Sequence, residues 1–496
     1  MFTKILIANR GEIAVRIMRT CREMGIATVA VYSEADRQAL HVLEADQAVF
    51  LGPAEPTESY LSIAKIIAAA RSTDAQAIHP GYGFLAENPD LAAACLQAGL
   101  TFIGPPENAI RDLGDKTVAR RLMIQGGVPV IPGMSQTEAD PERLAAEADK
   151  IGYPVLIKAA AGGGGKGMRV VTAAGDFKDA CAAAAREAQN AFGNGAIYLE
   201  KYLAKPRHVE FQILADTKGH IIHLLERECS IQRRHQKIIE ETPSPALTPD
   251  LRAQMGAAAV AAAKASGYVN AGTVEFLLDQ DNRFYFLEVN TRLQVEHPIT
   301  EMTTGIDLVR HQIEIAAGQP LTLRQSEISA RGHAIECRIY AEDPQNDFFP
   351  SPGKIRFMRE PGGPGIRNDC GIYTGFQVPV EYDPILSKLV VWAETRELAT
   401  RRMIRALENY VILGIKTPIP FLIDVLKAEA FQSGATYTDF IAAHFDKWQP
   451  AAADNDLARI AYIADAVWAR RRATRPTADS GPRFASPWET LGHWRK

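Results

Sequence analysis

The glycine-rich stretch at residues 153–172 decides the fold of this sequence. It consists of Tyr153-Pro-Val-Leu-Ile-Lys158, then Ala-Ala-Ala-Gly-Gly-Gly-Gly-Lys-Gly, then Met168-Arg-Val-Val-Thr172. The apolar runs on both sides predict two strands, so the glycines form the turn of a hairpin. Gly162–Gly167 has GxGxxG spacing, but a dinucleotide-binding loop must lead from a strand into a helix. It is not a Walker A loop either, because Gly167 follows Lys166.

This hairpin has the chemistry of a phosphate-binding loop. Glycine has no Cβ atom, so backbone N–H groups can close over phosphates. Lys116 and Lys158 are candidates to neutralise the phosphate charge. The alternative, a flexible surface hairpin, is less attractive because ordering four consecutive glycines costs much conformational entropy.

The segments on either side of the hairpin predict a multidomain chain of mixed class. Over residues 1–112, short apolar strands alternate with helical patterns, which predicts an α/β, Rossmann-like open parallel sheet with helices on both faces. Lys116 to about Thr304 has the pattern of an antiparallel α+β unit, with an alanine-rich helix over roughly 250–266. Residues 331–446 form a third block of short strands and Pro/Gly turns, followed by a helix near 397–409.

Three oxygen-bearing side chains in apolar strands predict a magnesium site. Glu275 lies in Gly-Thr-Val-Glu-Phe-Leu-Leu, where an unpaired charge would be costly. Glu288 and Asn290 are two apart on the next expected strand and share a face. Mg²⁺ prefers hard oxygen ligands. The alternative is a pair of strand ends with solvated acids.

The stretch after Asn290 predicts an anion site. If it stays extended, Arg292, Gln294 and Glu296 share one face. A cation, an amide and a carboxylate beside a metal site suit a small oxyanion that must be held and deprotonated. The basic run Gln232–Lys237 supplies further anion donors, and an edge strand with solvated charges is the alternative.

Bulk composition excludes several classes. The chain has 496 residues, enough for two to four domains, and a net charge of −4, which argues against nucleic acid as the main partner. Its six cysteines have no CxxC or zinc spacing and predict reduced thiols. We expect no membrane helix and no signal peptide, since Asn9-Arg10 ends the first apolar run, and therefore a cytoplasmic protein.

Five motifs in order resemble the biotin carboxylase family over about residues 1–446. They are Lys4-Ile-Leu-Ile-Ala-Asn-Arg-Gly-Glu-Ile-Ala, His79-Pro-Gly-Tyr-Gly-Phe-Leu-Ala-Glu-Asn, Gly162–Arg169, Glu226-Arg-Glu-Cys-Ser-Ile-Gln-Arg-Arg-His-Gln-Lys and Glu288-Val-Asn-Thr-Arg-Leu-Gln-Val-Glu-His-Pro. In this family ATP phosphorylates bicarbonate to carboxyphosphate, which decomposes to CO₂ and phosphate. Phosphate then takes the biotin N–H proton, and the resulting enolate attacks CO₂.

The resemblance implies roles for the matching residues. ATP would be bound by Lys116, Lys158, Gly163, Gly164, Gly165, Lys166, Gly167, Met168, Glu200, Lys201, Tyr202, Leu203, His208, Gln232, His235, Glu275 and Glu288. Mg²⁺, or in its place Mn²⁺, would be held by Glu275, Glu288 and Asn290. Bicarbonate and biotin would meet Lys237, Arg292, Gln294, Val295, Glu296, Arg338, Tyr82 and Glu87. Lys237, Arg292, Glu296 and Arg338 would be catalytic, with Glu296 as the base and Arg338 stabilising the biotin enolate. The family more often has Arg where this loop has Lys166, but both are cationic.

The resemblance also implies domains and partners. We expect an N-terminal domain over 1–114, an ATP-grasp domain over 115–330 with a mobile lid at about 131–203, a C-terminal β-rich domain over 331–446 and a tail over 447–496. No Met-Lys-Met motif is present, so the biotin would sit on a separate carrier protein, and a separate subunit would be the carboxyltransferase. Such a chain serves an acyl-CoA or pyruvate carboxylase. A homodimer is expected, with Arg19 and Glu23 as candidate interface residues, and the tryptophan-bearing tail would either dock another subunit or pack on its own enzyme.

Two other functions compete with this interpretation. Another ATP-grasp ligase that forms an acyl phosphate would explain the loop and the carboxylates, but not Arg292, Gln294 and Glu296 together with Arg338. A catalytically inactive scaffold subunit is disfavoured because every polar position that the chemistry needs is present.

Overall fold

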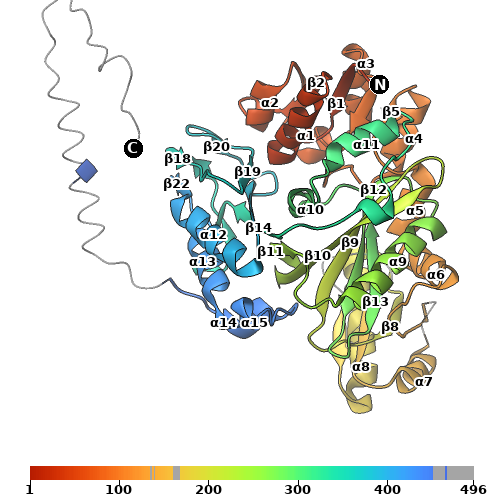
Figure 1. Ribbon diagram of the computed structural model, residues 1–496. Helices are drawn as coiled ribbons and strands as arrows, with labels where there is room; N and C mark the ends of the chain where they lie inside the picture. The colour runs from red at the N-terminus through yellow and green to blue at the C-terminus, as the bar shows by residue number, and fades with distance from the viewer. Residues whose placement is uncertain (135–136, 139, 160–167, 451–463, 466–496) are drawn as a thin grey trace, which may run out of the picture. The chain divides into compact units, whose positions relative to one another are not determined.

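The computed structural model describes residues 1–134, 137–138, 140–159, 168–450 and 464–465 (Figure 1). The chain forms two units, Met1–Trp448 and Gln449–Lys496. All the elements below belong to the first unit. Of the tail expected over 447–496, only residues 447–450 and 464–465 are among the described residues.

The N-terminal part is built on a five-stranded sheet (Figure 1). In spatial order the strands are β3 (Gln47–Gly52), β2 (Ala27–Ser33), β1 (Lys4–Ile7), β4 (Ala77–His79) and β5 (Thr101–Phe102), and every neighbouring pair is parallel. Ile5 and Ile7 pack in one apolar cluster and Leu6 in another, so β1 is buried on both faces. A parallel sheet covered on both faces was the prediction, and it is confirmed.

A smaller sheet carries the glycine hairpin. Its order is β7 (Arg169–Val171), β6 (Val155–Ala159), β8 (Ile197–Lys201), with antiparallel pairing throughout. Helices α7 (Pro141–Ile151) and α8 (Phe177–Phe192) share an apolar core with it. The antiparallel pairing of β6 with β7 confirms that a strand, not a helix, follows the loop. The loop itself, residues 160–167, lies outside the described part of the chain.

The third sheet has eight antiparallel strands. In spatial order they are β13 (Phe284–Asn290), β12 (Asn270–Leu278), β9 (Arg207–Ala215), β10 (Ile221–Arg233), β11 (Gln236–Thr242), β14 (His333–Tyr340), β21 (Ile385–Ala393) and β19 (Ile366–Cys370). The sequence pattern suggested separate blocks before and after residue 330. The sheet runs across both, because β11 pairs directly with β14.

Strand β10 begins with an apolar stretch and extends through the charged segment 226–233. Arg227 in this extension is fully buried. The Arg227 guanidinium donates to Glu210 Oε1 at 2.5 Å and to Gln212 Oε1 at 2.8 Å. Hydropathy could not indicate this extension because its charges are satisfied by residues distant in the sequence.

Helices cover both faces of the C-terminal half of this sheet. On one face α10 (His297–Thr304) contributes Ile299 to a small cluster with Ala334 and Val390. The alternate residues of β14 and β21 pack in another core with α12 (Arg396–Asn409). Both α12 and the alanine-rich α9 (Pro249–Ala265) fall where helices were predicted.

The remaining elements connect these layers. The helices are α1 (Gly11–Glu23), α2 (Leu40–Glu44), α3 (Ile63–Ser72), α4 (Pro89–Gln97), α5 (Glu107–Gly114), α6 (Lys116–Gln125), α11 (Leu308–Ala316), α13 (Ile419–Lys427), α14 (Glu429–Gln432) and α15 (Phe440–His444). The short strands are β15 (Glu342–Asp343), β16 (Phe349–Pro350), β17 (Gly353–Lys354), β18 (Phe357–Arg359), β20 (Gln377–Val378) and β22 (Val411–Leu413). Among the described residues, none of the helices has the length and apolar character needed to cross a membrane.

Candidate active site

Lys237 on β11 lies at the centre of a buried group of glutamates. Its ammonium group donates to Glu210 Oε2 at 2.6 Å, Glu275 Oε1 at 2.8 Å and Glu296 Oε1 at 2.7 Å. Burial alone would lower the pKa of Lys237, but the three carboxylates raise it well above its ordinary value. Lys237 therefore stays positive at neutral pH.

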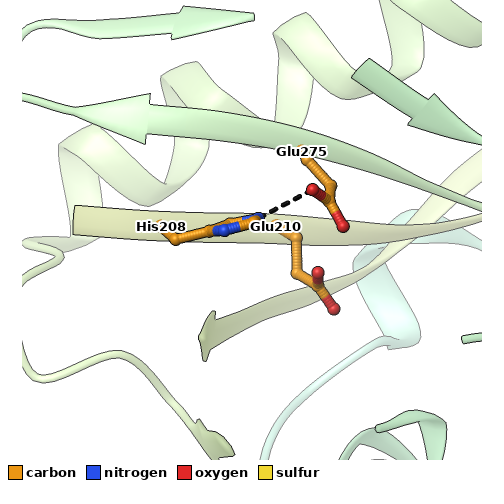
Figure 2. Close-up of side chains that lie close together, drawn as sticks. All are labelled: His208, Glu210 and Glu275. Carbon is orange, nitrogen blue, oxygen red and sulfur yellow. Dashed lines mark ion pairs between the residues drawn. The ribbon is translucent and has the colours of Figure 1, made fainter. Parts of the chain in front are cut away.

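His208, Glu210 and Glu275 lie close together (Figure 2), and Glu210 and Glu275 both accept hydrogen bonds from Lys237. His208 and Glu210 share a face of β9, and Glu275 on β12 is the register partner of Glu210. His208 Nε2 lies 2.8 Å from Glu275 Oε2. Burial disfavours the charged imidazole, yet Glu275 raises the pKa of His208. In turn, Lys237 and His208 overcome burial and hold the pKa of Glu275 well below its usual range.

Glu275, Glu288 and Asn290 come together as predicted. Glu275 and Glu288 are register partners across β12 and β13, and Asn290 Nδ2 donates to Glu275 Oε1 at 2.8 Å. Glu288 is exposed to a hollow of about 220 Å³ that Lys116 and Glu87 also line.

The residues present fit a divalent cation. The pKa of Glu288 is raised, first by loss of surrounding water and then by the negative charge of Glu275. A cation between two facing carboxylates would relieve this repulsion, and the open hollow would let it keep water and phosphate ligands.

The segment after Asn290 is not an extended strand, so that expectation is wrong. Residues 291–296 form a loop, and Glu296 is the N-cap residue of α10. Glu87 fixes the start of the loop by accepting from the Thr291 N–H at 3.0 Å and Arg292 Nε at 2.9 Å. The helix start, not strand alternation, directs Glu296 into the site.

Arg292 and Gln294 join the same network despite this difference. Arg292 donates to Gln294 Oε1 and to Asn290 Oδ1, both at 3.0 Å, and Gln294 Nε2 donates to Glu275 Oε1 at 2.9 Å. The polar side chains of the loop therefore reach Glu275 and Asn290. Val295 lies between Gln294 and Glu296 in the chain, in the turn that leads into α10.

Glu296 is a fully buried carboxylate between two cations. Its Oε1 accepts from Lys237, and its Oε2 accepts from Arg338 Nη2 at 3.1 Å. Burial would raise the pKa of Glu296, but Lys237 and Arg338 hold it well below its usual range. The carboxylate is therefore ionised at neutral pH, as a base must be.

Lysines line a second, smaller hollow of about 50 Å³, which shares Lys116 and Glu288 with the first. Lys116, the first residue of α6, and Lys158 on β6 line it together with Glu200 of β8. Lys158 Nζ donates to Glu200 Oε2 at 2.8 Å. Met168 is half-buried just before β7, whereas Gly163–Gly167 with Lys166 lie outside the described residues.

The other predicted ATP residues lie at the ends of strands. Lys201 Nζ donates to the backbone carbonyls of Gly152 and Tyr153 at 2.8 and 3.1 Å, and Tyr202 and Leu203 follow half-buried. Gln232 is buried near the end of β10, and His235 lies in the turn to β11 with φ of 68°.

Tyr82 lies near Lys388 and does not line the lysine-lined hollow. Its hydroxyl donates to Glu12, and the Lys388 ammonium is 5.7 Å from its ring centre. Lys388 is the register partner of Arg338. Glu12 and Lys388 were not among the predicted residues.

Glu210, Glu240 and Glu336 were also not among the predicted residues. All three are fully buried glutamates, on β9, β11 and β14 respectively. The rule that singled out Glu275, a charge inside an apolar run, applies equally to Glu336 in His-Ala-Ile-Glu-Cys-Arg-Ile-Tyr and could have found it.

Comparison with known proteins agrees with this geometry. Residues 1–110 match the family model described as "Biotin carboxylase, N-terminal domain", and 336–443 match "Biotin carboxylase C-terminal domain". Between them, 115–324 match "Carbamoyl-phosphate synthase L chain, ATP binding domain". Fold and site thus define an ATP-grasp ligase.

Similarity to whole proteins is equally extensive. The chain is 55% identical over 441 residues to a pyruvate carboxylase subunit of Methanothermobacter thermautotrophicus, covering 89% of this chain and 90% of that protein. It is 52% identical to biotin carboxylase 1 of Bacillus subtilis, covering 90% and 99% of the two chains. The crystal structure of a biotin carboxylase from Campylobacter jejuni superposes with a TM-score of 0.86 at 47% identity, over 90% of this chain and 99% of that one. The chain therefore belongs to the biotin carboxylase family, and it catalyses the ATP-dependent carboxylation of biotin.

Proposed function

We propose that this enzyme uses bicarbonate to carboxylate biotin carried by a separate protein, and that the network around Lys237 is its reaction centre. The observation that carries the proposal is the Glu296 carboxylate held between Lys237 and Arg338. Arg292 and Gln294 belong to the same network, next to a lysine-lined hollow.

The nucleotide occupies the hollow in this proposal. Lys116 and Lys158 neutralise the phosphates, and the glycine hairpin supplies backbone N–H groups above them. Glu200, Lys201, Tyr202 and Leu203 serve the base at the end of β8, while His208, Gln232 and His235 complete the nucleotide site from β9 and the β10–β11 hairpin. The small sheet of β6, β7 and β8 would act as the lid that excludes water.

Glu275, Glu288 and Asn290 would hold Mg²⁺, which supplies charge compensation for the phosphates of ATP. The crystal structure of the 2-oxoglutarate carboxylase biotin carboxylase domain from Hydrogenobacter thermophilus was determined with MgADP and bicarbonate. It superposes with a TM-score of 0.86 at 47% identity, over 91% of this chain and 99% of that one. Mn²⁺ is a possible substitute, because it favours the same oxygen ligands.

Arg292, Gln294 and the Val295 backbone bind bicarbonate, and Glu296 removes its proton as the oxygen attacks the γ-phosphorus of ATP. The bond from the γ-phosphorus to the β–γ bridging oxygen breaks, so that ADP leaves and carboxyphosphate forms. Carboxyphosphate then breaks into CO₂ and phosphate, and phosphate takes the biotin N–H proton. Arg338 stabilises the enolate oxygen that forms, and Lys237 stabilises charge on the bicarbonate side. Glu87 and Tyr82 shape the biotin side of the pocket.

Nucleotide hydrolysis with single components omitted tests the proposal. ADP release by the purified chain is expected to need bicarbonate and to rise strongly when free biotin is added. ADP formation that ignores both would favour a different acyl-phosphate-forming ligase. Failure to bind ATP with Mg²⁺ would instead favour an inactive subunit.

The partners are part of the proposal. The methylcrotonoyl-CoA carboxylase alpha subunit of Dictyostelium discoideum is 50% identical over 99% of this chain, an alignment that includes the tail, and this chain covers 70% of it. We infer a homodimer that works with a separate biotin carrier and a carboxyltransferase subunit, with residues 447–496 as the docking segment. All six cysteines are free, in keeping with a cytoplasmic location.

A further inference from the structure

Two fully buried glutamates face each other directly behind Arg338. Glu240 on β11 and Glu336 on β14 are register partners in the antiparallel ladder, so their side chains leave the sheet on the same face. Arg338 lies two residues after Glu336 and shares this face. The three side chains therefore form one group inside the protein.

Within the described part of the chain, only one of the two glutamates is paired with a cation by a hydrogen bond. Glu240 Oε1 accepts from Arg338 Nε at 2.6 Å. Among the same described residues, Glu240 Oε2 and both oxygens of Glu336 have no hydrogen-bond partner. Two adjacent carboxylates without solvent strongly disfavour double ionisation, so one of them keeps a proton.

The nearby cations are already engaged by other carboxylates. Lys388 on β21 is 3.1 Å from Glu12 Oε2 of α1 and 4.0 Å from Asp369 Oδ2 of β19. Arg338 is shared between Glu240 and Glu296. Lys388 and Arg338 lower the pKa of Glu336, but burial and the charge of Glu240 outweigh them and raise it well above its ordinary value.

The side chains at the start of the helix packed on this face add no compensating positive charge. The N-cap residue of α10 is Glu296, whose negative charge also raises the pKa of Glu336. The next residue, His297, is fully buried, and burial together with Lys388 holds its pKa well below the ordinary value. His297 is therefore neutral at neutral pH and cannot stand in for the missing cation.

We propose that Glu240 and Glu336 share a single proton, with Glu336 as the carboxylic acid that donates to Glu240, and that this pair positions the Arg338 guanidinium. The inference rests on the role proposed above for Arg338. With one shared proton the group of Arg338, Glu240 and Glu336 is neutral overall. With none it carries a net negative charge next to the place where the biotin enolate forms, which opposes the reaction.

The matched substitutions keep size and hydrogen bonding while changing charge. Glu336→Gln retains a donor for Glu240 and is neutral at every pH. Glu240→Gln removes the anionic acceptor of Arg338 Nε. Glu241→Gln is the control, because Glu241 is also buried on β11 and paired with Arg396 at 2.6 Å, but its register neighbours place it on the other face of the strand.

Carboxylation of free biotin by the full chain from pH 6 to 10 is the first readout. Glu336→Gln is expected to retain kcat within about twofold at pH 7 and to lose less activity than the wild type at alkaline pH. Glu240→Gln is expected to lower kcat more than tenfold without changing KM for ATP, whereas Glu241→Gln stays within twofold. A Glu336→Gln enzyme as slow as Arg338→Ala, or one that fails to fold, would overturn the inference, since a neutral residue of the same shape should be tolerated.

Thermal stability against pH is the second readout and does not depend on catalysis. A carboxyl whose pKa is raised by folding stabilises the protein least above that pKa, because it must then ionise inside the fold. The Tm of Glu336→Gln minus that of the wild type should therefore rise as pH increases. A difference that is constant or falls with pH would mean that Glu336 is an anion.

Arg338→Ala measured in parallel tests the proposed role of Arg338 separately from the proposed shared proton. If Arg338→Ala keeps wild-type kcat, the proposed role of Arg338 is wrong, while the stability readout still tests the shared proton. If Arg338→Ala is slow but the Glu336→Gln results are the reverse of those expected, only the shared proton is wrong.

Discussion

Among the facing glutamates of the eight-stranded sheet, two pairs differ in their access to solvent. Glu275 and Glu288 are register partners across β12 and β13, and Glu288 is exposed to a hollow of about 220 Å³. Glu240 and Glu336 are register partners across β11 and β14, and both are fully buried. We call them the open pair and the closed pair.

The difference teaches that access decides how like charges are compensated. A hydrated cation with its phosphate ligands can reach the open pair, so repulsion there favours metal binding. The closed pair is sealed beneath α10, so a proton is the only cation small enough to compensate it without rearrangement. In our proposals, the same arrangement of two carboxylates would therefore serve metal binding in one place and side-chain positioning in the other.

Replacing the cation that connects the two regions should have the largest effect. Lys237 contacts Glu275 of the open pair and Glu296, which contacts the Arg338 held by the closed pair. Lys237→Gln is expected to lower biotin carboxylation by about 10³-fold or more, because it removes charge stabilisation inside a dry site. Carbon-14 bicarbonate incorporation measures this, with exposed Lys264→Gln as the control. Near wild-type turnover would contradict the assigned role.

Replacing Arg338, the cation bound to the closed pair, should have the second largest effect. Arg338→Ala is expected to reduce carboxyl transfer by about 10²-fold, since one stabilising donor of this kind is worth that much, while ATP affinity changes little. Isothermal titration with an ATP analogue and single-turnover transfer to free biotin separate the two effects. If the variant loses nucleotide binding but keeps carboxyl transfer, Arg338 serves the nucleotide site and not the biotin site.

The open pair should respond to metal and the closed pair should not. Glu288→Gln is expected to raise the Mg²⁺ concentration for half-maximal activity by about tenfold or more, because it removes one anionic oxygen ligand. Glu336→Gln is the matched control and should leave the Mg²⁺ dependence unchanged. If both variants raise the Mg²⁺ concentration for half-maximal activity equally, the proposed difference between the open and closed pairs is wrong.

Deleting the tail should have the smallest effect on chemistry. Without residues 450–496 the enzyme is expected to carboxylate free biotin within about twofold of the full chain, because no residue of the two pairs lies there. Co-purification of the carrier and transferase subunits should fall sharply if the tail docks them. Undiminished co-purification would remove that part of the proposal.

Local pattern was sufficient to predict much of the fold and part of the site. Apolar runs identified β1, β6 and the hairpin that follows, and a lone glutamate in an apolar strand identified Glu275. Local pattern did not predict a strand whose charged side chains are paired with residues of another strand. The charged extension of β10 is a strand because Glu210 and Gln212 satisfy Arg227, and no hydropathy window contains both sides of that contact.

The sequence by itself determined the family, the ATP-binding chemistry and the residue types of the site, because these depend on motifs that are contiguous in the chain. The tertiary structure alone decided that Glu296 enters the site from a helix start and that one sheet joins the blocks before and after residue 330. It alone decided which glutamates face each other and which pair is open. Hydrogen bonding between strands distant in sequence sets these relations, and charge repulsion depends on the distances and solvent access that result.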